Sequence, residues 1–121
     1  MTRGIRGATT VNKNTQEEIL ENTKNLIEEM IENNGVQPDD ISHVFISATE
    51  DVNAVFPAKA LRSLEGWTYV PVMCMREMDV QQGLAFCIRV MMVVNTSKGQ
   101  KEIQHVFHKD AVKLRPDLAG R

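Results

Sequence analysis

The chain has 121 residues, a length at which one hydrophobic core forms, so we expect a single domain over residues 1–121. Its hydrophobic fraction of 42% and charged fraction of 25% are typical of a globular protein. The formal net charge of −2 excludes the strongly basic surface with which many proteins bind nucleic acid or acidic membranes. We therefore expect neither nucleic acid nor a membrane as a partner.

The sequence also indicates the cellular compartment of the protein. No apolar stretch reaches the length of about 18 residues that a membrane-spanning helix needs. The first residues lack the apolar centre of a signal peptide. Two cysteines, Cys74 and Cys87, are too few for a disulfide framework, so we expect free thiols and a cytoplasmic protein.

The first half of the chain predicts a strand, a long helix and a second strand. Residues 3–11 favour a strand. Thr15 and Glu18 then form a capping-box pattern, and apolar residues recur on one side of a helix that ends at Gly35. The acidic side of this helix is interpreted as a solvated face. Residues 43–48 predict the second strand.

The second half predicts a short helix and three more strands. A helix of about two turns is expected over 56–64, followed by a strand over 69–75. Pro71 has no amide hydrogen for a sheet ladder, which indicates an edge strand or a bulge. Residues 86–94 and 103–108 predict the fourth and fifth strands.

Arg89 interrupts the apolar run 86–94, which otherwise reads as a strand buried on both faces. Its guanidinium keeps its proton and needs an anion or water. Nothing acidic lies within the run. The anion would come from elsewhere in the fold or from a ligand, unless the side chain reaches solvent.

The element order predicts an α+β fold, with a mixed five-stranded sheet, one long helix and one short helix. The long helix covers one face of the sheet and leaves the other bare, so we expect self-association. The tail over 115–121 is expected to be irregular and mobile.

Several kinds of chemistry find no support in the residue pattern. Phosphate-binding glycine loops are missing, and His43, His105 and His108 lack zinc spacing, so we expect no metal. The cysteines have no neighbouring histidine and are interpreted as buried, inert thiols. What remains is a set of arginines on different elements, with Glu77 as an acceptor, which would suit a small polyanion. These arginines are Arg6, Arg62, Arg89 and Arg115.

Five motifs in order carry a resemblance over almost the whole chain. They are RGIRGATT from Arg3, AVFPAKA from Ala54, CMREMDV from Cys74, CIRVMM from Cys87 and LRPDL from Leu114. Together they resemble the monofunctional chorismate mutases of the bacillus type. The resemblance implies a homotrimer with a pseudo-α/β-barrel centre and active sites at the subunit interfaces. It also implies rearrangement of chorismate to prephenate, on the route to phenylalanine and tyrosine, without any cofactor.

The resemblance also assigns residue roles. It implies that Arg89 donates to the ether oxygen of chorismate, that Arg6 holds a carboxylate, and that Glu77 accepts from the ring hydroxyl. The residues implied to line or close the pocket are Phe56, Lys59, Arg62, Met73, Cys74, Phe107, Leu114 and Arg115.

The chain departs from the family pattern at two of these positions. Phe107 stands where a tyrosine is common, and Met73 where a threonine is familiar. We expect weaker substrate binding from the first and a more apolar wall from the second. Two other functions remain open at this point: an imine deaminase on a similar trimeric (YjgF-like) architecture, and a non-catalytic trimer that binds a metabolite.

Overall fold

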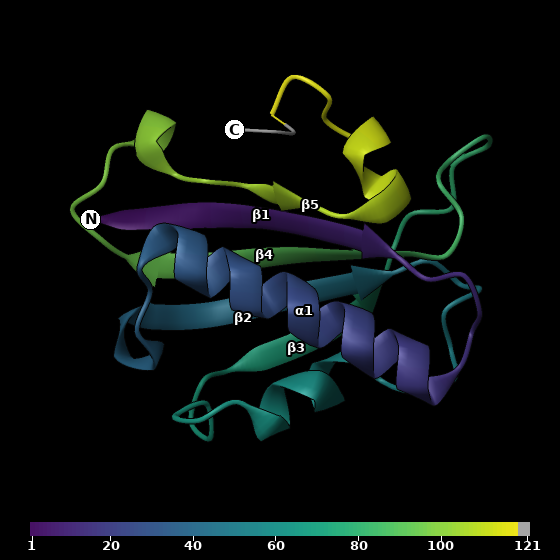
Figure 1. The fold of residues 1–121 in the computed structure, drawn as a ribbon, viewed down its shortest axis with the longest axis horizontal. Coiled ribbons are helices and arrows are strands. Elements are labelled where there is room, and N and C mark those ends of the chain that lie inside the picture. The colour runs from purple at the N-terminus through teal and green to yellow at the C-terminus, as the bar shows by residue number, and fades with distance from the viewer. Residues whose placement is uncertain (119–121) are drawn as a thin grey trace.

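A computed structural model describes residues 1–118 of the chain. It contains one mixed sheet of five strands in the order β3-β2-β4-β1-β5, and the helix α1 lies across one face of this sheet (Figure 1). β4 is antiparallel to its neighbours β1 and β2, whereas β3 is parallel to β2 and β5 is parallel to β1. The α+β fold predicted from the sequence is therefore confirmed. The strands and the helix are β1 (Thr2–Thr10), α1 (Gln16–Asn34), β2 (Ile41–Ala48), β3 (Val72–Arg76), β4 (Cys87–Asn95) and β5 (Val106–Phe107).

The caps of α1 form as the sequence indicates, with one change. The side chain of Thr15 accepts a hydrogen bond from the amide of Glu18 at 3.3 Å. The Glu18 carboxylate accepts from the amide of Asn12 instead of returning to Thr15, so only half of the capping box is present. Gly35 ends the helix in the left-handed region at φ 60°, where a residue without a Cβ is favoured.

The hydrophobic core lies between α1 and the sheet. Ile19, Leu26, Ile27 and Met30 of the helix are fully buried against alternate residues of β1 and β4. Gly7 makes this contact possible, because a Cβ there would lie 2.2 Å from the sulfur of Met30. Gly7 thus serves helix packing.

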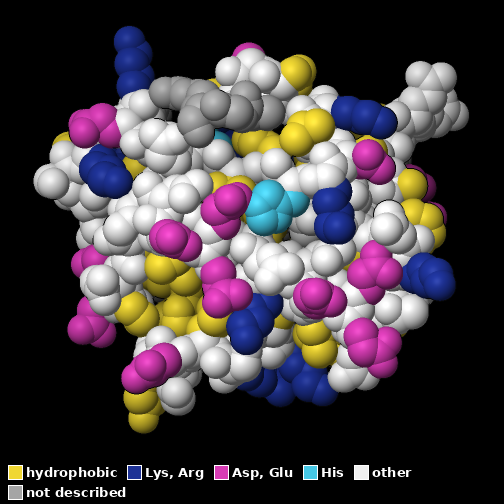
Figure 2. Space-filling model, in the orientation of Figure 1, with side chains coloured by type: hydrophobic (Ala, Val, Ile, Leu, Met, Phe, Trp, Pro, Cys, Tyr) yellow, Lys and Arg dark blue, Asp and Glu magenta, His cyan; other side chains and the backbone are white. Residues whose placement is uncertain are grey.

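The outer side of α1 carries charged residues. Glu17, Glu21, Glu28 and Glu32 are exposed, as predicted. Figure 2 shows acidic and basic side chains spread over the face of the molecule that α1 covers. No helix among the described residues is long and apolar enough to cross a membrane.

In the single chain, the middle of β4 is buried on one face only, as expected for a sheet covered by one long helix, and burial of the other face by self-association stays a prediction. Ile88, Val90, Met92 and Val94 are buried beneath α1. Arg89 and Met91 alternate with them and are exposed, because no element of the described chain covers the second face at these two residues, whereas Cys87 at the start of the strand is buried. We call this second side the open face.

The remaining elements differ from the predictions in length. The short helix is a 3₁₀ helix over Pro57–Ser63. β3 is an edge strand, as Pro71 indicated. The fifth strand has only two residues because the Asn34 side chain of α1 binds the backbone of Gln104, with both hydrogen bonds at 2.8 Å. Three further 3₁₀ turns lie at Pro38–Asp40, Gln100–Glu102 and Lys109–Lys113.

Residues 116–118 of the tail form a turn and no helix or strand, and the expected mobility of the tail stays a prediction. The rest of that expectation, over 119–121, lies outside the described residues.

Candidate active site

The open face gathers polar side chains from three neighbouring strands. Arg89 of β4 pairs in register with Ser47 of β2 on one side and with Ala8 of β1 on the other. Residues that pair in register, or lie two positions apart on a strand, point to the same face. Arg6, two residues before Ala8, and Phe107, which pairs with Ala8, therefore belong to the open face as well. The sheet thus brings Arg6, Arg89 and Phe107 to one side.

The partner of Arg89 comes from elsewhere in the fold. Glu77 follows β3, and its amide donates to the carbonyl of Ala48 at 2.9 Å, which fixes it beside the end of β2. The Oε2 atom of Glu77 accepts a hydrogen bond from Nη1 of Arg89 at 3.1 Å. The Arg89 side chain is 49% exposed and that of Glu77 is 22% exposed. The pair is therefore open enough to meet a ligand.

Glu77 is held in its ionised form. Burial acts to raise the pKa of this carboxyl, but hydrogen bonds from the Met78 amide and Ser47, together with the Arg89 charge, outweigh it and lower the pKa. Oε1 accepts from the Met78 amide and Oε2 from Ser47 and Arg89, each at 3.1 Å. At neutral pH the site therefore presents a fixed negative charge beside a positive one.

Glu77 and Arg89 line a pocket of about 390 Å³, together with Leu114. Its wall is formed by the segment that connects β3 to β4. Asp51 anchors this segment, since both of its carboxylate oxygens lie 3.1 Å from the amide of Phe86, a residue with φ 51°. Three of the sequence-predicted site residues thus meet in one cavity, and Ser47 and Asp51 support them without having been predicted.

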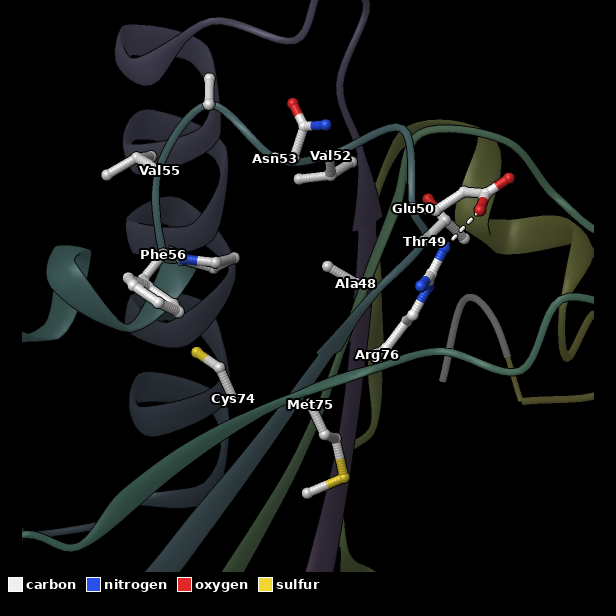
Figure 3. A pocket seen from close by; sticks show the side chains of 12 residues that line it. Ala48, Thr49, Glu50, Val52, Asn53, Val55, Phe56, Cys74, Met75 and Arg76 are labelled. Atoms are coloured by element: carbon white, nitrogen blue, oxygen red, sulfur yellow. Dashed lines mark hydrogen bonds and ion pairs between the residues drawn. The ribbon is translucent and has the colours of Figure 1, made fainter.

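Phe56 and Cys74 lie in a second, larger pocket of about 730 Å³. Figure 3 shows Cys74 pointing toward Phe56, with an ion pair between Glu50 and Arg76 on the far side of the pocket. Phe56 is 76% exposed, so its ring has little contact with its own chain. The two pockets share Thr49 and Glu50 in their walls but are otherwise separate.

The other predicted pocket residues line neither cavity. Lys59 and Arg62 are exposed on the 3₁₀ helix Pro57–Ser63, and Met73 is exposed on the open face, where it pairs with Phe45. Arg115 forms two hydrogen bonds with Asp117, at 3.0 and 2.8 Å. A single chain therefore does not bring all the predicted residues together.

The thiols are protonated at neutral pH. Burial raises the pKa of Cys87 to about 11, and it raises the pKa of Cys74 as well. Cys87 is buried as predicted, whereas Cys74 is half-buried because it borders the larger pocket. Among the described residues, no group of three or more His, Cys, Asp or Glu side chains could hold a metal ion.

The fold and this cluster define a small α+β protein whose charged site, built on an open sheet face, suits a small anionic ligand. The chain belongs to the chorismate mutase type I family, whose model matches residues 2–118. It is 58% identical to the chorismate mutase AroH of Bacillus subtilis (strain 168) over 119 residues, which cover 98% of this chain and 94% of that protein.

Two further proteins to which the chain is similar are also chorismate mutases. The chorismate mutase AroH of Thermus thermophilus is 42% identical over 119 residues, covering 98% of this chain and 97% of that protein. A solved chorismate mutase from Clostridium thermocellum superposes with a TM-score of 0.87 at 50% identity, covering 90% of this chain and 96% of its own. The resemblance inferred from five motifs is thus confirmed at the level of sequence and fold.

Proposed function

We propose that the protein is a chorismate mutase, an isomerase that rearranges chorismate to prephenate for phenylalanine and tyrosine synthesis. Family membership over residues 2–118 and 58% identity to a chorismate mutase support this function. The structural observation that carries the mechanism is the Arg89–Glu77 pair, half-open to solvent in a pocket of the open face.

The reaction is an intramolecular Claisen rearrangement, in which a carbon–oxygen bond breaks as a carbon–carbon bond forms. It needs no nucleophile and no proton transfer. The enzyme must hold a flexible dicarboxylate in its reactive shape and stabilise the charges that separate in the transition state. Negative charge develops on the ether oxygen and positive charge on the ring, so a fixed cation and a fixed anion are the groups required.

In this proposal Arg89 donates to the ether oxygen. A guanidinium has five N–H donors and Glu77 takes one of them, so others remain for the substrate. Glu77 accepts from the ring hydroxyl and places its negative charge beside the electron-poor ring. Arg6, on the same face, holds a carboxylate of the substrate.

We further propose that the active unit is a homotrimer. Phe45, Met73, Met75 and Met91 form an exposed apolar patch on the open face, with exposures from 39 to 61%. Such a patch on a sheet of this size suits burial against another copy. Assembly would set the Phe56–Cys74 pocket of one copy beside the Arg89–Glu77 pocket of the next, with Lys59 and Arg62 at the entrance.

An assay of purified protein with chorismate tests the activity. We expect chorismate to disappear and prephenate to form, at a rate that a chelator does not change. Turnover no faster than the uncatalysed rearrangement would overturn the proposed function. If chorismate then raised the melting temperature, the protein would be a metabolite-binding trimer instead.

Subunit mixing tests the shared site. An Arg89→Met chain and a Phe56→Asp chain should each be nearly inactive alone, because each lacks one half of every site. After the two are unfolded and refolded together, mixed trimers should regain a measurable part of the wild-type rate. No recovery in refolded mixed trimers would place each complete site within one chain.

A further inference from the structure

We propose that Ser47 is a positioning residue that holds the Glu77 carboxylate for the reaction. Its hydroxyl donates to Oε2 of Glu77 at 3.1 Å, the same oxygen that accepts from Arg89. The inference rests on the proposed function, because it assigns a partner to one of the proposed catalytic residues.

The place of Ser47 in the sheet makes it a rigid support. β2 lies between β3 and β4, and Ser47 is paired in register with Met75 on one side and with Arg89 on the other. Both edges of its backbone are therefore in the sheet ladder. A hydroxyl on such a strand moves less than one on a loop, so it can fix a carboxylate that itself lies just beyond the end of β3.

Ser47 also supplies a donor that does not depend on the substrate. The Arg89 guanidinium is shared, since the proposed reaction draws it toward the ether oxygen. The Met78 amide binds the other carboxylate oxygen, Oε1. Ser47 is thus the side chain that continues to donate to Oε2 when Arg89 turns to the ligand. It keeps the Glu77 carboxylate directed into the pocket that Glu77 and Arg89 line.

The electrostatics of Glu77 agree with this role. A hydrogen bond to the charged form of a carboxyl favours that form, and the Ser47 hydroxyl is one of the groups that lower the pKa of Glu77. Removing the hydroxyl should raise this pKa and allow the carboxylate to rotate. Both changes act on Glu77 alone and leave the backbone of β2 in place.

The test compares Ser47→Ala and Ser47→Thr with Ser42→Ala. Ser42 is on the same strand, where its hydroxyl contacts Nδ1 of His43 at 2.9 Å, away from Glu77. We expect Ser47→Ala to lower kcat about tenfold, the size expected for one hydrogen bond to a charged group. The acidic limb of its pH–rate profile should move to higher pH. Ser47→Thr, which keeps a hydroxyl, and Ser42→Ala should both stay close to wild type.

A second readout separates this inference from the proposed function. The Glu77 carboxyl can be titrated by carbon NMR in wild type and in Ser47→Ala, whether or not the protein turns over chorismate. A higher pKa in the variant supports the positioning role. An unchanged Glu77 titration, or an unchanged kcat and pH–rate profile in a folded Ser47→Ala enzyme, would overturn it, and an inactive wild type would overturn only the proposed function.

Discussion

The two faces of the sheet are built from the same strands but carry different residues. Beneath α1, the side chains of Ile5, Ile88 and Met92 are fully buried and make the core. On the open face, one position along the same strands, Arg6 and Arg89 are accessible. The period of two along a strand allows one segment to supply both stability and chemistry.

The open face lowers the free-energy cost of placing a charged residue at position 89. A guanidinium buried in a core would oppose folding. Here the side chain is half-exposed and paired with Glu77, so the fold of a single chain bears little of that cost. In the proposed trimer, Arg89 would instead lose its water on assembly and substrate binding, where its charge would stabilise the transition state.

Among substitutions on the open face, we expect Phe45→Asp to have the largest effect. Phe45 is 39% exposed, so Phe45→Asp should leave the fold of a chain intact. A carboxylate in a buried interface costs several kcal/mol, and we expect loss of the trimer and of all activity. Light scattering and the chorismate assay check this. Tyr69→Asp, at a position that is 94% exposed, is the matched control and should leave both unchanged.

Replacing Glu77 should affect the reaction without affecting the assembly. Glu77→Gln keeps an acceptor but removes the charge, and we expect kcat to fall about a hundredfold. In the wild-type enzyme, kcat/KM should stay constant as the pH falls through the ordinary pKa of glutamic acid. It should decrease only at a still lower pH, because the pKa of Glu77 is lowered. The glutamine variant should lack that acidic limb. A variant of wild-type rate would remove Glu77 from the catalytic set.

The lowered pKa of Glu77 should also make the stability of the fold depend on pH. A group whose pKa is lower in the folded state stabilises the fold above its unfolded-state pKa, and this stabilisation is lost as the pH falls through the folded-state pKa. Unfolding in urea, measured across acidic pH, should therefore show less acid destabilisation for Glu77→Gln than for wild type. Equal pH dependence in the two proteins would contradict the assignment.

On the helix-covered face, a single methyl group should affect stability alone. Gly7→Ala places a Cβ against Met30, and overpacking of this kind costs about 1–3 kcal/mol. Urea unfolding measures the loss. Gly99→Ala, where the nearest contact is the flexible end of Glu102 at 3.2 Å, should be close to neutral. Similar stability losses in both variants would show that close approach of α1 is not what Gly7 provides.

The smallest expected effect concerns Phe107. Phe107→Tyr adds a hydroxyl on the open face, and one neutral hydrogen bond is worth about 1 kcal/mol, or about fivefold in KM. We expect a lower KM with little change in kcat. An unchanged KM would indicate that the ring does not reach the substrate carboxylate.

Local signals in the sequence predicted the parts of the fold that depend on neighbouring residues. The Thr15 cap and Gly35 bounded the long helix, and Pro71 indicated the edge strand. The two-residue fifth strand could not be predicted in this way, because it depends on Asn34 binding a backbone 70 positions away.

The site was predictable only in part for the same reason. Arg89 was conspicuous as a charge in an apolar strand. Its contact with Glu77, however, depends on the position in the fold of the residue that follows β3. Ser47 gave no signal, since a serine near the end of a strand is ordinary in sequence. Its role appears only when β2 is placed beside β4.

The role of Arg89 is tested most directly by the kcat of Arg89→Met, measured together with the thermal melting of this variant. We expect kcat to fall by a factor of about a thousand or more, since both the donors and the charge are lost. Stability should change by no more than about 1 kcal/mol, as for an exposed ion pair. Arg3→Met, which removes an arginine bonded to the carbonyl of Lys98, should remain active. Full turnover by folded Arg89→Met would contradict the central claim that the open face performs the chemistry through this charge.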